Sequence, residues 1–318
     1  MNLRTATLAI VVPMFNESRS IDAFIDRAVA ALALPDITSR FVFVDDGSTD
    51  DCVARVERRL SSLPGSCVVQ LSRNFGKEAA LLAGLDTAIK SDCDAVVMID
   101  ADLQHPPEAI PRLVEAWRDD NDVVIAARSS RAGDPWSRRL MTRLFYRGMN
   151  WLANIPIVDG DGDFRLLGRD VVEALCELRE QHRFTKGLYS WVGFRQIRVP
   201  VTFDERSEGT SRFRGGHLVS LALNAVTSFS AKPLRLVLVS GFAIGALSLF
   251  YAVWIAVETF AHGRQLPGYA SMFCGMMFLG GVQLIGIGLL GEYVGRTYIE
   301  SKSRPPYLVR RVIEGAGP

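Results

Sequence analysis

Short apolar runs alternate with amphipathic stretches through the first two-thirds of the chain. The runs are rich in valine, isoleucine and phenylalanine, a pattern typical of strands buried on both faces of a sheet. The stretches between them repeat apolar positions at helical spacing, and this β-α-β order predicts an α/β fold with a doubly wound, mainly parallel sheet. The predicted strands cover residues 7–12, 41–45, 68–71, 95–100, 123–127 and 197–203, and the predicted helices cover 19–33, 50–60, 77–89 and 107–118.

Two much longer apolar stretches follow, at 236–257 and 265–291, with 22 and 27 residues and no charged side chain. At about 1.5 Å per residue, the shorter one spans roughly 33 Å as a helix, enough for a hydrocarbon core of about 30 Å. Both are predicted to be transmembrane helices. The alternative, two buried helices of a soluble core, fits poorly because globular helices rarely carry such long uncharged runs.

Basic residues flank these stretches unevenly, with several before the first and after the second but only Arg264 between them. The positive-inside rule therefore predicts that both ends of the chain lie in the cytoplasm. Leucine, valine and phenylalanine within 215–231 indicate a helix lying along the membrane surface. The predicted division is an α/β domain at 1–212, an interfacial helix at 213–233, two transmembrane helices with a short periplasmic loop at 234–292, and a cytoplasmic tail at 293–318.

Overall charge points to no polyanionic partner, since 36 basic and 35 acidic residues give a net charge of +1. Nucleic acid is therefore not an expected ligand. The five cysteines are scattered and form no Cys-x-x-Cys pair, which favours reduced core residues over a disulfide framework or a zinc site.

Two carboxylates end the predicted strand at 95–100, in the sequence Asp100-Ala101-Asp102, and Gln104 follows them. Ligands gather at the carboxyl ends of parallel strands, and carboxylates hold hard cations such as Mg²⁺ or Mn²⁺ beside substrate phosphates. The three side chains are therefore candidate metal ligands. The alternative is that Asp102 only caps the helix that the following prolines begin.

Other predicted strands also end in polar groups. The first ends in Pro13-Met14-Phe15-Asn16-Glu17 and lacks a Gly-x-Gly-x-x-Gly motif, which argues against a nicotinamide or flavin enzyme. Asp45 and Asp46 end the second and suit hydrogen bonding to ribose or base, although the turn after them is also consistent with a structural role. Lys77 follows the third and is expected to hold a diphosphate, unless it is simply a solvated residue at a helix start.

Arginines are frequent after the fifth predicted strand, where a solvated face is the simplest explanation. Arg128 and Arg139 are better candidates for phosphate binding, because guanidinium groups bind phosphate in a bidentate manner. The segment 159–165 resembles a calcium loop but lacks its later glutamate and its spacing, so its three carboxylates are expected to line a site instead.

Six motifs in this order resemble the polyprenyl-phosphate glycosyltransferases of glycosyltransferase family 2, over nearly the whole chain. The nearest resemblance is to the bactoprenol glucosyltransferases, and dolichyl-phosphate mannose synthase is more distant. The motifs are Pro13-Met14-Phe15-Asn16-Glu17, Val44-Asp45-Asp46-Gly47-Ser48, Ser72-Arg73-Asn74-Phe75-Gly76-Lys77, Asp100-Ala101-Asp102-Leu103-Gln104, Gly162-Asp163-Phe164-Arg165-Leu166-Leu167 and Gly291-Glu292-Tyr293-Val294-Gly295-Arg296.

The resemblance implies a GT-A fold, a nucleotide-sugar donor, a Mg²⁺ or Mn²⁺ ion and a lipid phosphate acceptor. Asp163 and Asp102 are the implied catalytic carboxylates, and Asp100, Asp102 and Gln104 the implied metal ligands. Two departures are Phe15 where the family usually has tyrosine, and Asp161 where relatives have threonine. The implied nucleotide-sugar contacts are Pro13, Phe15, Asn16, Glu17, Asp45, Asp46, Lys77 and Asp100, and the implied acceptor or diphosphate contacts are Arg128, Arg139, Arg206, Ser211 and Arg212.

The hypothesis is inverting transfer of a hexose from a UDP-sugar to undecaprenyl phosphate at the cytoplasmic face of a bacterial inner membrane. Glucose is favoured only by the resemblance, which also suggests a homo-oligomer such as a tetramer. Two alternatives remain open: dolichyl-type mannosyl transfer from GDP-mannose, and a protein of another class, either a membrane-tethered nucleotide-binding scaffold or a lipid translocase.

Overall fold

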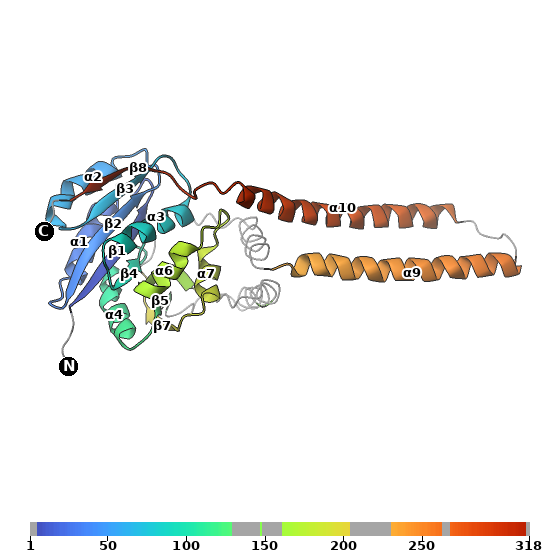
Figure 1. Ribbon diagram of the computed structural model, residues 1–318, viewed down its shortest axis with the longest axis horizontal. Helices are drawn as coiled ribbons and strands as arrows, with labels where there is room; N and C mark the ends of the chain where they lie inside the picture. The colour runs from blue at the N-terminus through green and yellow to red at the C-terminus, as the bar shows by residue number, and fades with distance from the viewer. Residues whose placement is uncertain (1–4, 129–146, 148–160, 204–229, 263–267, 316–318) are drawn as a thin grey trace.

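The computed structural model describes residues 5–128, 147, 161–203, 230–262 and 268–315. They form an α/β domain from which two long helices, α9 and α10, project side by side (Figure 1). The C-terminal end of α9 and the N-terminal end of α10 lie far from the α/β domain. The chain then returns to the domain and ends there.

One eight-stranded sheet forms the centre of the domain, in the order β7-β5-β6-β4-β1-β2-β3-β8. Neighbours pair in parallel except around β6, which is antiparallel to β4 and β5, and at the edge, where β8 is antiparallel to β3. The predicted, mainly parallel sheet is thus confirmed. The strands are β1 (Ala6–Met14), β2 (Ile37–Asp45), β3 (Cys67–Leu71), β4 (Ala95–Met98), β5 (Val123–Arg128), β6 (Asp161–Gly168), β7 (Gln196–Val201) and β8 (Val309–Glu314).

Helices cover both faces of the sheet, so the central strands are apolar on both sides. In β1, Leu8, Ile10 and Val12 face α1, α2 and α4, while Ala9 and Val11 face α3, α6 and α7. The helices are α1 (Ile21–Ala31), α2 (Cys52–Arg59), α3 (Lys77–Lys90), α4 (Ile110–Arg118), α6 (Arg169–Glu177), α7 (Thr185–Trp191), α9 (Lys232–His262) and α10 (Tyr269–Ser301), with short 3-10 turns η1 (Leu60–Ser62) and η2 (Pro107–Ala109).

Helix α3 lies unusually close to the sheet at Gly84. A Cβ atom built on this glycine would lie 2.2 Å from Val11 Cγ1 and 3.2 Å from Val44 Cγ2. The missing side chain therefore lets the helix backbone rest directly on β1 and β2. This contact fixes the position of α3, whose first residue, Lys77, lies at the carboxyl ends of the strands.

Two strands were not predicted from the sequence. β6 begins with Asp161-Gly162-Asp163, which suggested a loop, yet it runs between β4 and β5 and buries Phe164, Leu166 and Leu167. β8 falls in the segment assigned to a cytoplasmic tail, and its sequence is half charged. It nevertheless pairs with β3, because an edge strand needs only one partner and tolerates exposed charges.

Helices α9 and α10 are both long and apolar enough to cross a membrane. Their apolar side chains are uncovered by the rest of the described chain, as with Phe242 at 80% and Phe260 at 94% exposure. α10 continues ten residues past the predicted span, to Ser301. The predicted interfacial helix at 213–233 lies outside the described residues except for its last four.

Candidate functional site

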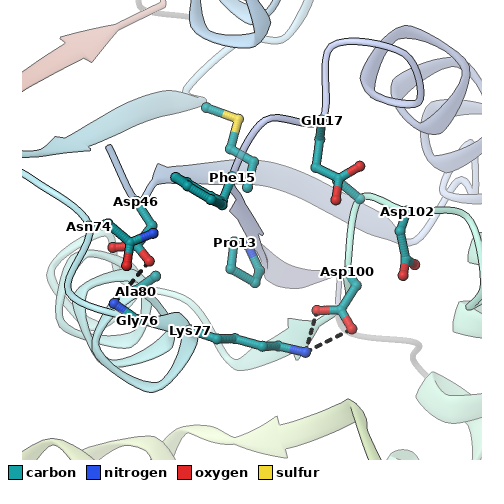
Figure 2. A pocket seen from close by; sticks show the side chains of 12 residues that line it. Pro13, Phe15, Glu17, Asp46, Asn74, Gly76, Lys77, Ala80, Asp100 and Asp102 are labelled. Atoms are coloured by element: carbon teal, nitrogen blue, oxygen red, sulfur yellow. Dashed lines mark hydrogen bonds and ion pairs between the residues drawn. The ribbon is translucent and has the colours of Figure 1, made fainter. Parts of the chain in front are cut away.

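A cavity of about 360 Å³ opens where β1 and β4 end and α3 begins. Figure 2 shows Lys77 pointing to Asp100 in it, with Glu17 and Asp102 on one side and Asp46 on the other. Several strand-end residues named from the sequence thus lie together at one edge of the sheet, where parallel strands end. The lining residues are Pro13, Met14, Phe15, Glu17, Asp46, Asn74, Gly76, Lys77, Ala80, Asp100, Ala101 and Asp102.

Lys77 joins two carboxylates at this cavity. Its Nζ lies 2.7 Å from Asp100 Oδ1 and 2.7 Å from Asp163 Oδ2. Burial favours the neutral amine, but the two carboxylates outweigh this effect and raise the pKa of Lys77. Burial likewise opposes ionisation of Asp163, yet the nearby Lys77 and Lys186 lower the pKa of Asp163. Both groups are therefore charged at neutral pH, and Lys186, on α7, is a cation that the sequence did not single out.

Asp100, Asp102 and His105 each offer a ligand atom, and the three atoms lie within 4.8 Å of one another. His105 Nδ1 is buried, has no hydrogen-bond partner among the described residues, and lies 3.6 Å from Asp100 Oδ2. Its ring contacts Phe164 and Phe203, with centroids 5.5 and 5.0 Å away. Burial lowers the pKa of His105 and so favours the neutral ring, the form that binds metals. This donor set fits a divalent cation.

Gln104 contacts Asp102 in the structure. Its Nε2 donates to Asp102 Oδ2 at 2.6 Å, and its backbone N–H donates to Asp102 Oδ1 at 3.0 Å. The amide therefore orients the carboxylate, while the next residue, His105, supplies the third candidate ligand. His105 was not predicted from the sequence, because it follows the Asp-x-Asp pair by three residues and immediately precedes a proline.

The loops beside the cavity are held by polar contacts of their own. Both carboxylate oxygens of Asp46 accept backbone N–H groups, from Phe75 at 2.7 Å and from Gly76 at 3.0 Å. Asp45 is fully buried, accepts hydrogen bonds from the Ser48 N–H and the Gln70 amide, and is not among the described residues that line the cavity. Asp45 therefore stabilises the end of β2 and the turn that follows it.

Asn16 likewise supports the loops. Its backbone has a φ of +58°, its N–H donates to Ser48 Oγ at 3.0 Å, and its side-chain oxygen accepts the Thr49 N–H at 2.8 Å. Beside it, Phe15 is 46% exposed and Pro13 lines the cavity, so both present apolar surface to a ligand. Glu17 accepts the Ser20 hydroxyl at 2.8 Å, and burial raises the pKa of Glu17.

Of the predicted phosphate-binding residues, Arg128 alone lies in the described part of the chain. Arg128 ends β5 and is not among the lining residues. The remaining candidates, Arg139, Arg206, Ser211 and Arg212, lie outside the described residues.

Comparison with known families gives two matches that together extend over most of the chain. A model described as glycosyl transferase family 2 matches residues 9–176, which include the strand ends around the cavity. A model described as the GtrB C-terminal hairpin matches residues 232–297, which include α9 and most of α10.

Individual relatives match nearly the full length. An uncharacterized glycosyltransferase of Synechocystis, sll0501, is 42% identical over 305 residues, covering 96% of this chain and 95% of that protein. A prophage bactoprenol glucosyl transferase homolog of Escherichia coli is 41% identical, covering 96% and 99%. The bactoprenol glucosyl transferase of Shigella phage SfX is 42% identical, covering 95% and 98%. Each of these matches therefore extends over both the α/β domain and the helical hairpin of this chain.

Proposed function

Since this chain belongs to glycosyltransferase family 2, with a GT-A domain, we propose that it transfers a hexose from a UDP-sugar to undecaprenyl phosphate. The observation that carries the proposal is the convergence of Lys77, Asp100, Asp102 and Asp163 at one sheet edge, in a chain that also holds two span-length apolar helices. The names of the relatives from Escherichia coli and phage SfX support a lipid acceptor and favour glucose as the sugar.

The donor site is assigned to the cavity. Phe15 and Pro13 present apolar surface that suits a nucleobase. On the other side of the cavity, Asp46 holds the loop at Phe75 and Gly76 through two hydrogen bonds. Lys77 is the cation for the diphosphate, since an ammonium group with three donors can exchange a carboxylate for a phosphate oxygen. Asn16 and Asp45 contribute by shaping these loops.

Asp100, Asp102 and His105 would hold a divalent cation, Mg²⁺ or Mn²⁺, next to the diphosphate. When bound, such an ion supplies positive charge that stabilises the departing nucleoside diphosphate. Gln104 keeps the Asp102 carboxylate oriented through its two hydrogen bonds. Lys77, on the opposite side of Asp100, adds a second positive charge to the same region.

The acceptor phosphate is already anionic at neutral pH, so the reaction needs positioning more than a base that creates a nucleophile. Attack from the face opposite the diphosphate inverts the anomeric carbon. Asp163 stays ionised beside Lys77 and is assigned to orient a sugar hydroxyl or to stabilise positive charge at that carbon. Arg128 and, outside the described residues, Arg139, Arg206, Ser211 and Arg212 are assigned to the phosphate groups.

The two apolar helices support a membrane protein with its α/β domain on the cytoplasmic side, since the basic residues lie at that end of both spans. Glycines along α10 leave room for close approach by another helix, which supports a homo-oligomer. The proposed division keeps residues 1–212 as the main part of the catalytic domain, to which β8 adds one strand.

Mixing the purified protein with Mg²⁺, undecaprenyl phosphate and a panel of nucleotide sugars tests the proposal. Mass analysis of the extracted lipid should show a hexose, with the highest rate from UDP-glucose. A higher rate with GDP-mannose than with UDP-glucose would show that the donor is GDP-mannose and not a UDP-hexose. Movement of lipid between leaflets with no lipid-linked sugar would overturn the enzymatic proposal in favour of a translocase.

A further inference from the structure

The end of α10 is bound to the α/β domain by a carboxylate. Glu300 Oε1 accepts the backbone N–H of Gln181 at 2.8 Å and that of His182 at 3.3 Å. The Gln181 amide in turn donates to the Arg304 carbonyl, just after the helix. The loop between α6 and α7 thus holds the last turn of α10 and the residues that follow it (Figure 1).

A second contact joins the segment after α10 to helix α3. The Tyr307 hydroxyl donates to Asp86 Oδ2 at 2.5 Å. Asp86 is only 7% exposed and also accepts two hydrogen bonds from Arg179, at 2.5 and 2.8 Å. Its helix begins with Lys77, which reaches Asp100 and Asp163 in the donor cavity. Helix α3 therefore lines the cavity at its N-terminal end, and at Asp86 it contacts the segment that follows α10.

We propose that Tyr307 and Glu300 are positioning residues that fix the membrane hairpin relative to α3, and so set where a lipid-borne phosphate meets the donor. This inference rests on the proposed function. The bilayer fixes the depth of the acceptor phosphate, and the span of α10 fixes the depth of the hairpin. The contacts at Glu300 and Tyr307 then help to relate that depth to Lys77. Displacements of about 1 Å in such geometry cost large factors in rate.

The Tyr307→Phe variant tests this with little risk to folding, because Asp86 keeps both hydrogen bonds from Arg179. The full-length protein in phospholipid vesicles would be assayed with undecaprenyl phosphate and, separately, with a short-chain, water-soluble prenyl phosphate. We expect the KM for undecaprenyl phosphate to rise about five- to tenfold. The KM for the nucleotide sugar and turnover of the soluble acceptor should stay within about twofold, since a diffusing acceptor does not depend on hairpin depth.

If Tyr307 only supported the fold, the Tyr307→Phe variant would lose activity equally with both acceptors. That result, or an unchanged KM for undecaprenyl phosphate, would overturn the inference. Glu300→Ala removes the other contact at an exposed position and should give the same split between acceptors. Tyr298→Phe, which removes a hydroxyl from an exposed tyrosine of α10, is the matched control and should change neither KM. If the unaltered protein glycosylates neither acceptor, the proposed function fails instead.

Discussion

The ammonium nitrogen of Lys77 lies 2.7 Å from a carboxylate oxygen of Asp163, an ion pair that joins the first turn of α3 to β6. Asp100 shares the same ammonium group at 2.7 Å. The cation assigned to the diphosphate is therefore paired with two carboxylates. Donor binding has to exchange these partners, which makes Lys77 a residue whose loss should affect both charge balance and substrate binding.

Replacing Lys77 with methionine should lower the rate of sugar transfer by about 100- to 1,000-fold, the usual cost of one preorganised electrostatic group. The variant leaves Asp100 and Asp163 facing the cavity with no shared cation. Lys90→Met, at the exposed other end of α3, is the control and should behave like the parent protein. Initial rates with saturating acceptor provide the measurement. A Lys77→Met variant that keeps more than about a tenth of the parent rate would contradict the assignment.

The proposed metal ligands can be tested by titrating Mn²⁺ into the full-length protein and following the paramagnetic resonance signal of the ion. Asp102→Asn should abolish binding, and Asp102→Ala should abolish metal-dependent transfer in a folded, membrane-inserted protein. His105→Ala should lower the affinity for Mn²⁺ at least about tenfold, because the proposed nitrogen ligand is lost. Gln104→Ala should have a smaller effect, since this amide contacts Asp102.

A larger loss of Mn²⁺ affinity in the Gln104 variant than in the His105 variant would instead support the ligand set inferred from the sequence. Removing the ion with a chelator should stop transfer, and adding Mg²⁺ or Mn²⁺ back should restore it. Activity that persists in chelator would refute the proposed metal dependence.

Adding one methyl group at Gly84 should destabilise the α/β domain by about 1–3 kcal/mol. The new Cβ would overlap Val11 and crowd Val44, so α3 has to move off the sheet. Chemical unfolding of Gly84→Ala measures the loss. Val11→Ala in the same chain opens space, and the double variant should lose less than the sum of the single variants. Strict additivity would show that the two positions are not in contact.

Stability should depend on pH through Glu78. Burial is the main influence and raises the pKa of this carboxyl above its ordinary 4.5, although hydrogen bonds from Thr185 oppose the effect. Between 4.5 and the raised value, the folded protein holds a proton that the unfolded chain has lost. The Glu78 contribution to stability therefore falls as pH rises through this window.

Glu78→Gln removes that proton exchange while keeping an oxygen that can accept the Thr185 hydrogen bonds. Its melting temperature in detergent should change less steeply with pH across the same window than that of the parent protein. Parallel profiles for the two proteins would show that Glu78 does not titrate differently on folding.

Elements with strong local patterns were predicted well from the sequence. The apolar runs that form β1 to β5 are buried on both faces of the sheet, so consecutive residues in each of them are apolar. The motif residues Glu17, Lys77, Asp100 and Asp102 converge because parallel strands end at one edge. For these strands and motif residues, the local sequence pattern and the tertiary structure favour the same residue types at the same positions.

Features that depend on a partner distant in the sequence were harder to predict. β6 is stabilised as a strand by β4 and β5 on both sides, although its first three residues suit a turn. His105 becomes a candidate ligand only because Phe164 and Phe203 pack its ring beside Asp100. Nothing in the few residues around either position encodes these contacts.

Strand β8 has a consequence for how the protein is made. It pairs with β3, but the ribosome synthesises it only after both apolar helices. Until then the backbone groups of β3 that β8 will pair are exposed to water, and exposed strand edges of this kind invite wrong pairing and aggregation. The sheet can therefore be completed only after both apolar helices have been synthesised, so the catalytic domain gains its last strand after the hairpin.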